Sequence, residues 1–213
     1  MGKFYKKEKE TFWLTRFVFL RAMGCIYLCA FFPITQQFEG LLGENGLLPA
    51  GTYLERIRSY AGMDSLYWWK LPTLFWIDQS NAFFLTMAWV GTIGSLVVLL
   101  GYANSIIMAL LWLLQLSFYH IGQDFWSFGW EANLLEMGFL AIFFCPLWEG
   151  RPFPSRSPPS KAIICLYLWV LFRLMLGSGL IKIRHDPCWR DFTCLIFHFE
   201  TQPIPNPFSP CST

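Results

Sequence analysis

Charged side chains are scarce in this sequence. Only 14% of its 213 residues are Asp, Glu, Lys or Arg, whereas 55% are hydrophobic; about 25% charged residues is usual for a soluble globular domain. The formal net charge of +2 leaves no strong excess of either sign, so the composition does not indicate a nucleic-acid partner. Aromatic residues are abundant instead, with 22 Phe, 11 Trp and 8 Tyr. We therefore predict a membrane protein rather than a water-soluble enzyme.

Long apolar stretches run through the sequence. Five of them approach the twenty or so residues that a helix needs to cross a hydrocarbon core roughly 30 Å thick. They cover residues 13–33, 82–100, 104–119, 130–148 and 162–183. A tight turn at Gly101 joins the second to the third, and Gly91 and Ser95 offer a small face for close helix packing. We predict an all-α polytopic membrane bundle of about five transmembrane helices.

The distribution of basic residues predicts the orientation in the membrane. Lys and Arg collect on the cytoplasmic side of membrane spans, and here they concentrate in residues 1–12 and in the loop 151–161. Five spans place both segments on one side, which we predict to be cytoplasmic. The loop 34–81 and the tail 184–213 then lie on the opposite side.

The loop between the first two spans is too long for a simple connector. Its residues 53–60 follow a pattern typical of a short amphipathic helix, and Trp68, Trp69 and Trp76 come after it. Tryptophan prefers the boundary between lipid and water, so we expect this loop to lie on the membrane surface. Two roles stay open for it: a lid packed over the bundle, or a surface that binds a partner.

Charged residues deep inside the expected spans need partners. At 1.5 Å per residue, Arg173 lies near the midpoint of its span and Glu136 roughly 5 Å from the midpoint of its own. Asn133 shares the helix face of Glu136, whereas Glu131 is about 140° round the helix and near the boundary. We predict an Arg173–Glu136 pair with Asn133 beside it. Its expected role is structural, docking the last two spans, and a direct functional role is the alternative. The partner of Arg21, in the first span, cannot be read from the sequence.

The seven cysteines fall into two groups. Small apolar filler is the expected role of those within or at the ends of spans, which are Cys25, Cys29, Cys145 and Cys165. Cys188 and Cys194 lie in the polar tail, and we predict a disulfide between them, with Cys211 left over. Zinc binding by this pair with His198 is the alternative, but the spacing fits no common zinc motif, so we expect no metal site.

Short motifs follow one another along the chain. They are Thr11-Phe-Trp-Leu-Thr-Arg16, Gly46-Leu-Leu-Pro49, Ser127-Phe-Gly-Trp-Glu131, Leu134-Leu-Glu136, Gly138-Phe-Leu, Cys145-Pro-Leu-Trp148, Gly179-Leu-Ile-Lys-Ile-Arg184, Cys188-Trp-Arg-Asp191, Glu200-Thr-Gln-Pro203 and Pro205-Asn-Pro207. In this order they resemble the N-terminal portion of the lipase maturation factor family. The tail residues that carry the resemblance are Lys182, Arg184, Trp189, Arg190, Asp191, Glu200, Pro203 and Asn206. The alternating prolines predict that the end of the tail is extended.

The resemblance implies a multi-pass protein of the endoplasmic reticulum membrane, with a cytoplasmic N-terminus and a lumenal tail. The implied function is chaperone-like help in the folding, dimer assembly and maturation of secreted lipases such as lipoprotein lipase. Lipases and membrane lipid are the implied partners, and neither enzymatic activity nor a cofactor is implied. The loop 34–81 and the tail 184–207 are the expected client contacts. Members of the family are usually more than twice this length, so we expect the tail to be truncated.

Other functions find less support in the sequence. Distant similarity of the family to membrane carboxylases suggests an enzyme that modifies secreted proteins, with Glu136 and Arg173 as the remnant of its site. The segment Gly177-Ser178-Gly179 is similar to the serine motif of an intramembrane protease, but no His lies within a span to act as its base. No internal repeat is visible, which argues against a transporter built from related halves.

Overall fold

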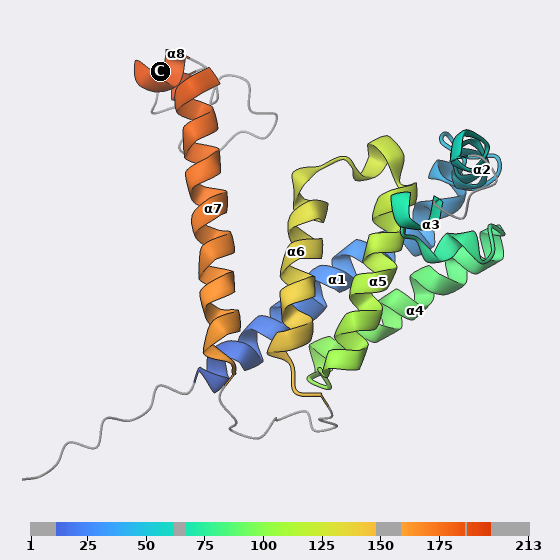
Figure 1. The fold of residues 1–213 in the computed structure, drawn as a ribbon, viewed down its shortest axis with the longest axis horizontal. Helices are drawn as coiled ribbons and strands as arrows, with labels where there is room; N and C mark the ends of the chain where they lie inside the picture. Colours follow the sequence, from blue (N-terminus) through green and yellow to red (C-terminus); the bar gives the residue numbers. More distant parts are fainter. Residues whose placement is uncertain (1–11, 62–66, 148–158, 186, 197–213) are drawn as a thin grey trace, which may run out of the picture. The chain divides into compact units, whose positions relative to one another are not determined.

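The computed structural model describes residues 12–61, 67–147, 159–185 and 187–196 (Figure 1). Every regular element in these ranges is helical and none is a strand, so the all-α prediction is confirmed. The chain divides into two compact units, Met1–Ile164 and Cys165–Thr213, each with its own internal contacts.

Long helices build the described part of the first unit. They are α1 (Trp13–Leu41), α4 (Asn81–Leu100), α5 (Ser105–Ile121) and α6 (Gly129–Phe144). Short elements occupy the connections: α2 (Ala50–Ala61), α3 (Tyr67–Lys70), and the 3-10 turns η1 (Leu74–Trp76) and η2 (Gln123–Trp126). Helix α1 packs chiefly on α4, while α5 packs on both α4 and α6 (Figure 1). The second unit holds most of α7 (Lys161–His185) and the short α8 (Pro187–Arg190).

Helices occupy all five apolar stretches of the sequence. The helices α1, α4 and α7 are long and apolar enough to cross a membrane, and α5 is a shorter apolar helix of 17 residues. Helix α6 has 16 residues, which gives it a length of about 24 Å. The chain is thus a helical membrane protein, and its number of crossings stays a prediction.

Helix α1 runs farther than the sequence predicts. The expected span ends at Pro33, but the helix continues to Leu41. A proline removes one backbone hydrogen bond and can bend a helix without ending it. The turns after Pro33 bury Ile34 and Phe38, which are 3% and 2% exposed. That burial stabilises the additional turns and carries the helix past the expected boundary.

Small residues let α1 and α4 approach closely. A Cβ atom on Gly24 would lie 2.7 Å from the backbone nitrogen of Leu99, and one on Gly91 would lie 2.6 Å from the ring of Phe31. The backbone oxygen of Ser95 also lies against Gly24. The small face predicted on the second span is therefore the contact between α1 and α4.

Part of the loop after α1 packs on the bundle. Phe75 in η1 is fully buried, with its ring centroid 4.6 Å from that of Phe84 in α4 and 4.9 Å from that of Phe118 in α5. Thr73 Oγ1 donates to the carbonyl oxygen of Ser117 at 3.3 Å. The Ser117 hydroxyl oxygen accepts a backbone N–H of η1 at 3.0 Å. These contacts make this part of the loop a lid, which is one of the two roles that the sequence leaves open.

Two local predictions from the sequence are confirmed. The amphipathic segment at residues 53–60 belongs to α2, which buries Leu54 against the rest of the unit. The turn at Gly101 ends α4 with a φ of 110°, a backbone conformation that favours glycine. The side chain of Asn104 then caps α5 by accepting a backbone N–H at 2.9 Å.

Candidate functional site

Contacts within the second unit fold α8 back onto the end of α7. Lys182 Nζ lies 4.6 Å from the centroid of the Trp189 ring, which is a cation–π distance. Arg190 Nε donates to the carbonyl oxygen of Ile183 at 2.9 Å. The structure therefore brings together Lys182, Trp189 and Arg190, three of the tail residues that carry the family resemblance.

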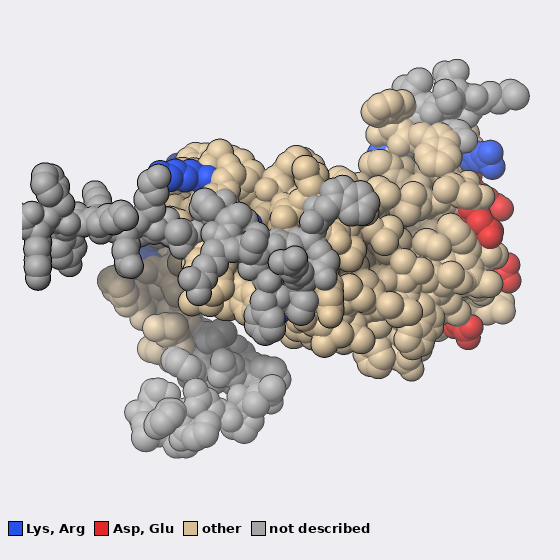
Figure 2. Space-filling model, turned by 90° about the horizontal axis from the view of Figure 1, so that it is seen from below, with Lys and Arg blue, Asp and Glu red and all other residues tan. Residues whose placement is uncertain are grey.

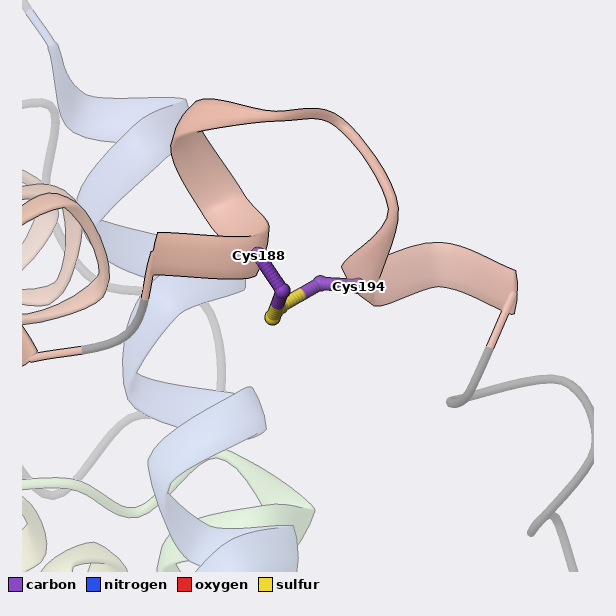
Figure 3. The surroundings of a disulfide bond; sticks show 2 residues. All are labelled: Cys188 and Cys194. Atoms are coloured by element: carbon purple, nitrogen blue, oxygen red, sulfur yellow. A yellow bond between two sulfur atoms is a disulfide. The ribbon is translucent and has the colours of Figure 1, made fainter.

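A disulfide joins Cys188 and Cys194 at the same place (Figure 3). Their Cα atoms are 4.9 Å apart, and they are separated by six positions in the sequence. The small loop that the bridge closes includes Asp191, whose side chain is exposed. We call residues 182–185 and 187–194 the α7–α8 corner. A ring contact, a hydrogen bond and a disulfide hold this corner together.

The remaining tail residues are less completely described. Arg184 is exposed at the end of α7. Glu200, Pro203 and Asn206 lie outside the described residues, as does His198 of the zinc alternative. Across the described ranges, no group of three or more His, Cys, Asp or Glu side chains could hold a metal ion. The structure thus describes the first half of the tail motifs.

The two charged residues of the predicted intramembrane pair lie in different units of the chain. Glu136 and Asn133 are half-buried on α6 in the first unit, while Arg173 belongs to α7 in the second. The Arg173–Glu136 pair therefore stays a prediction. Arg21 places its guanidinium carbon 3.4 Å from the centroid of the Phe17 ring, one turn earlier on α1. This cation–π contact stabilises the charge of Arg21 within its own helix.

A pocket of about 260 Å³ opens in the first unit, between the second half of α1 and the turn from η2 into α6. Gln37 and Glu131 contribute polar groups to its wall. The other wall residues are Cys29, Ala30, Pro33, Ile34, Phe38, Leu41, Phe125, Trp126 and Trp130. We call this cavity the Glu131 pocket, and its wall is mostly apolar and aromatic.

The carboxylate of Glu131 is almost completely enclosed. The residue is 2% exposed, and its Oε2 atom has no hydrogen-bond partner within the described part of the chain. Glu131 stands in the first turn of α6, where the helix dipole favours a negative charge. A buried carboxylate oxygen without a partner costs free energy. The carboxylate is therefore available to a ligand that enters the pocket.

The sequence does not predict this pocket. Glu131 falls near the boundary of its expected span, and its position along the helix does not show which other segment lies opposite. One signal was present, since Glu131 ends the aromatic motif Ser127-Phe-Gly-Trp-Glu131. The opposite wall comes from α1, far earlier in the chain, and no local pattern connects the two walls.

Two more polar side chains are buried inside the bundle. Tyr27 of α1 is fully enclosed, and its hydroxyl lies where a Cβ atom on Gly138 of α6 would stand. Gln115 of α5 is also fully buried, and neither polar atom of its amide has a hydrogen-bond partner among the residues that the structure describes. Unlike Glu131, neither side chain lines the Glu131 pocket.

Comparison with known proteins gives the family of the chain. Residues 14–211 match the family model described as the lipase maturation factor transmembrane domain. The chain belongs to the lipase maturation factor family. The matched lipase maturation factor domain contains both the Glu131 pocket and the α7–α8 corner.

Relatives of both lipase maturation factor types match nearly the whole chain. Lipase maturation factor 1 of Bos taurus is 45% identical over 97% of this chain and 38% of its own length. The human protein of the same name is 44% identical over 92% of this chain and 36% of its own length. Lipase maturation factor 2 of Xenopus tropicalis is 34% identical over 91% of this chain and 28% of its own length. The chain thus spans less than two fifths of these relatives. No solved structure matches it.

Proposed function

We propose that this chain assists the maturation of secreted lipases from the endoplasmic reticulum membrane, as a chaperone-like factor and not as a catalyst. The observation that carries the proposal is 45% identity, over 97% of the chain, to a protein named lipase maturation factor 1. The step that we assign to it is the folding and dimer assembly of a lipase such as lipoprotein lipase.

The proposed orientation has a cytoplasmic N-terminus and a lumenal tail. Basic residues concentrate in residues 1–12 and 151–161. Figure 2 shows Asp and Glu side chains gathered at the end of the first unit where α2 lies, beside a Lys or Arg side chain. The disulfide of the α7–α8 corner supports a lumenal tail, because disulfides persist in the lumen and are rare in the cytosol.

Two surfaces on the proposed lumenal side suit an unfinished client. The loop after α1 carries large apolar side chains that the rest of the unit does not cover: Leu47, Tyr60 and Trp69 are 73%, 85% and 88% exposed. Incompletely folded proteins expose apolar surface of the same kind. The α7–α8 corner is the second surface, and its rigidity lowers the conformational entropy lost on binding.

The specific activity of secreted lipoprotein lipase tests the proposal. The chain is expressed in cells that lack lipase maturation activity, beside the full-length bovine relative and an empty vector, and secreted activity is divided by secreted lipase mass. We expect the chain to raise specific activity above the empty vector. No rise, at equal membrane expression and with the full-length relative active, would show that this chain does not by itself mature the lipase.

A further inference from the structure

The Glu131 pocket has the features of a cation-binding site. Neither the description of the family nor the names of the relatives mention such a site. Glu131 is 2% exposed, and one of its carboxylate oxygens has no hydrogen-bond partner in the described part of the chain. Among the described residues that line the pocket, none is Lys or Arg. The negative charge of Glu131 is therefore not balanced by a Lys or Arg side chain in the described wall of the pocket.

The wall of the pocket suits a cation on an apolar stem. Trp126 and Trp130 contribute indole rings, which attract cations through their π-faces. Pro33 and Ile34 add aliphatic surface from α1. The side chains of Lys and Arg combine these two needs, since their methylene stems pack on apolar surface while the charged group reaches a polar partner.

The charge of the pocket wall also favours a basic polypeptide over a lipid headgroup as the occupant. A phospholipid carries a phosphate next to any ammonium, and the described wall offers that phosphate no Lys or Arg. A second pocket, of about 360 Å³, lies at the same end of the first unit and is lined by Glu44, Glu55 and Asp78 among others. A Lys or Arg side chain carries no anionic group of its own, so it matches a wall with one carboxylate and no described cation better than a phospholipid headgroup does.

We propose that the Glu131 pocket holds a Lys or Arg side chain of a client polypeptide, with Glu131 as the charge partner and Trp126 and Trp130 beside the stem. The choice of client rests on the proposed function, under which the polypeptide is an unfinished lipase. The cation preference of the pocket is a property of this chain alone and is tested without any lipase.

Thiol modification measures the cation preference directly. Gln37→Cys puts a thiol on the pocket wall, and Gln36→Cys puts one on the neighbouring exposed position that does not line the pocket. The purified full chain in detergent is treated with a cationic trimethylammonioethyl methanethiosulfonate or with its anionic sulfonatoethyl counterpart. Peptide mass spectrometry then follows each introduced thiol. We expect the ratio of cationic to anionic rate at position 37 to exceed that at position 36 by about tenfold.

Charge variants link that ratio to Glu131. Glu131→Gln should remove the excess at position 37, because it keeps the shape of the side chain and deletes the charge. Glu55→Gln deletes a carboxylate at the same end of the unit but outside this pocket, and should leave the ratio at position 37 within about twofold. Equal ratios at positions 36 and 37, a ratio insensitive to Glu131→Gln, or no reaction at position 37 would each overturn the cation site.

A protection experiment identifies the occupant. An acetylated and amidated pentapeptide with a central arginine should slow modification of position 37 by uncharged methyl methanethiosulfonate, by about threefold at a peptide concentration of twice its Kd. The same peptide with citrulline should not protect, and Glu131→Gln should abolish protection by the arginine peptide. If phosphatidylcholine nanodiscs protect position 37 and the arginine peptide does not, the occupant is a lipid headgroup and the polypeptide proposal is wrong.

The two proposals fail in different ways. A clear cation preference together with no gain in lipase specific activity would refute the proposed function and leave the site intact. A gain in lipase activity together with equal cationic and anionic rates would refute the site alone. If both proposals hold, Glu131→Gln should lower the gain in lipase specific activity more than Glu55→Gln does.

Discussion

At the scale of single residues, small side chains decide how closely the helices of the first unit approach. Gly24 and Gly91 bring α1 against α4, and Gly138 makes room on α6 for the hydroxyl of Tyr27. Each of these positions faces a neighbour that has no space for an added methyl group. Packing at this density means that single-atom changes alter stability.

Gly138→Ala should destabilise the protein, because its new Cβ atom would collide with the Tyr27 hydroxyl. We expect the free energy of unfolding to fall by about 1–3 kcal/mol, measured by thermal unfolding of the purified chain in detergent. Tyr27→Phe removes the hydroxyl, so the double variant should recover most of the loss. Gly40→Ala is the matched control, since nothing lies within 4 Å of its added Cβ atom. Equal losses of unfolding free energy in Gly138→Ala and Gly40→Ala would contradict the contact between Gly138 and Tyr27.

At the scale of elements, the long apolar stretches of the sequence predict where the helices lie. They do not predict which helices and loops pack together. The five apolar stretches all became helices because a long apolar run can satisfy its backbone only internally when it lies in lipid. Phe75 packs on both α4 and α5, and Trp126 lines a pocket together with the second half of α1. Both arrangements bring together residues that are distant in the sequence. Such contacts depend on the shapes of both surfaces, which no single stretch of sequence records. Within the α7–α8 corner, the two cysteines of the polar tail predict the disulfide, whereas the contacts of Trp189 with Lys182 and of Arg190 with Ile183 could not be read from the sequence.

The Arg173–Glu136 pair can be tested by exchanging its charges. Arg173→Glu and Glu136→Arg should each lower the amount of folded protein in the membrane, because breaking a buried pair costs about 3–5 kcal/mol. The double exchange should restore much of that amount, measured by fluorescence-detected gel filtration. Combining Glu136→Arg with Arg21→Glu is the control and should give no recovery, because the prediction pairs Glu136 with Arg173 and not with Arg21. A double exchange no better than the single ones would contradict the pairing.

The disulfide predicts how the α7–α8 corner responds to reduction. Cys188→Ser and Cys194→Ser should each destabilise the corner by about 2 kcal/mol, and the double variant should be no worse than either, because both remove the same cross-link. Limited proteolysis at the end of α7 measures the loss. Cys165→Ser, a free thiol on the same helix, should leave proteolysis unchanged. Alkylation of Cys188 or Cys194 in the unreduced protein would show that the bridge is not formed.

At the scale of the whole molecule, the proposed orientation makes a prediction that needs a single substitution. Leu47→Thr creates an N-glycosylation acceptor at Asn45, in a turn whose Leu47 side chain is 73% exposed. In microsomes this variant should gain a glycan that a glycosidase removes, because the proposed orientation places the loop after α1 in the lumen. Lys9→Asn creates the same kind of acceptor at position 9 and should stay unmodified. Glycosylation at position 9 but not at Asn45 would show that the protein has the opposite orientation in the membrane.

The lid has a further consequence for the synthesis of the chain. Thr73 bonds to Ser117, which lies 44 positions later, and Phe75 packs on Phe118. At 5–20 residues per second, the ribosome needs roughly 2–9 s to add that intervening stretch. During this interval the lid has no α5 to dock on, and Phe75 can pack only on α4. A stall between α4 and α5 would therefore leave the lid incompletely docked although α1 and α4 are complete.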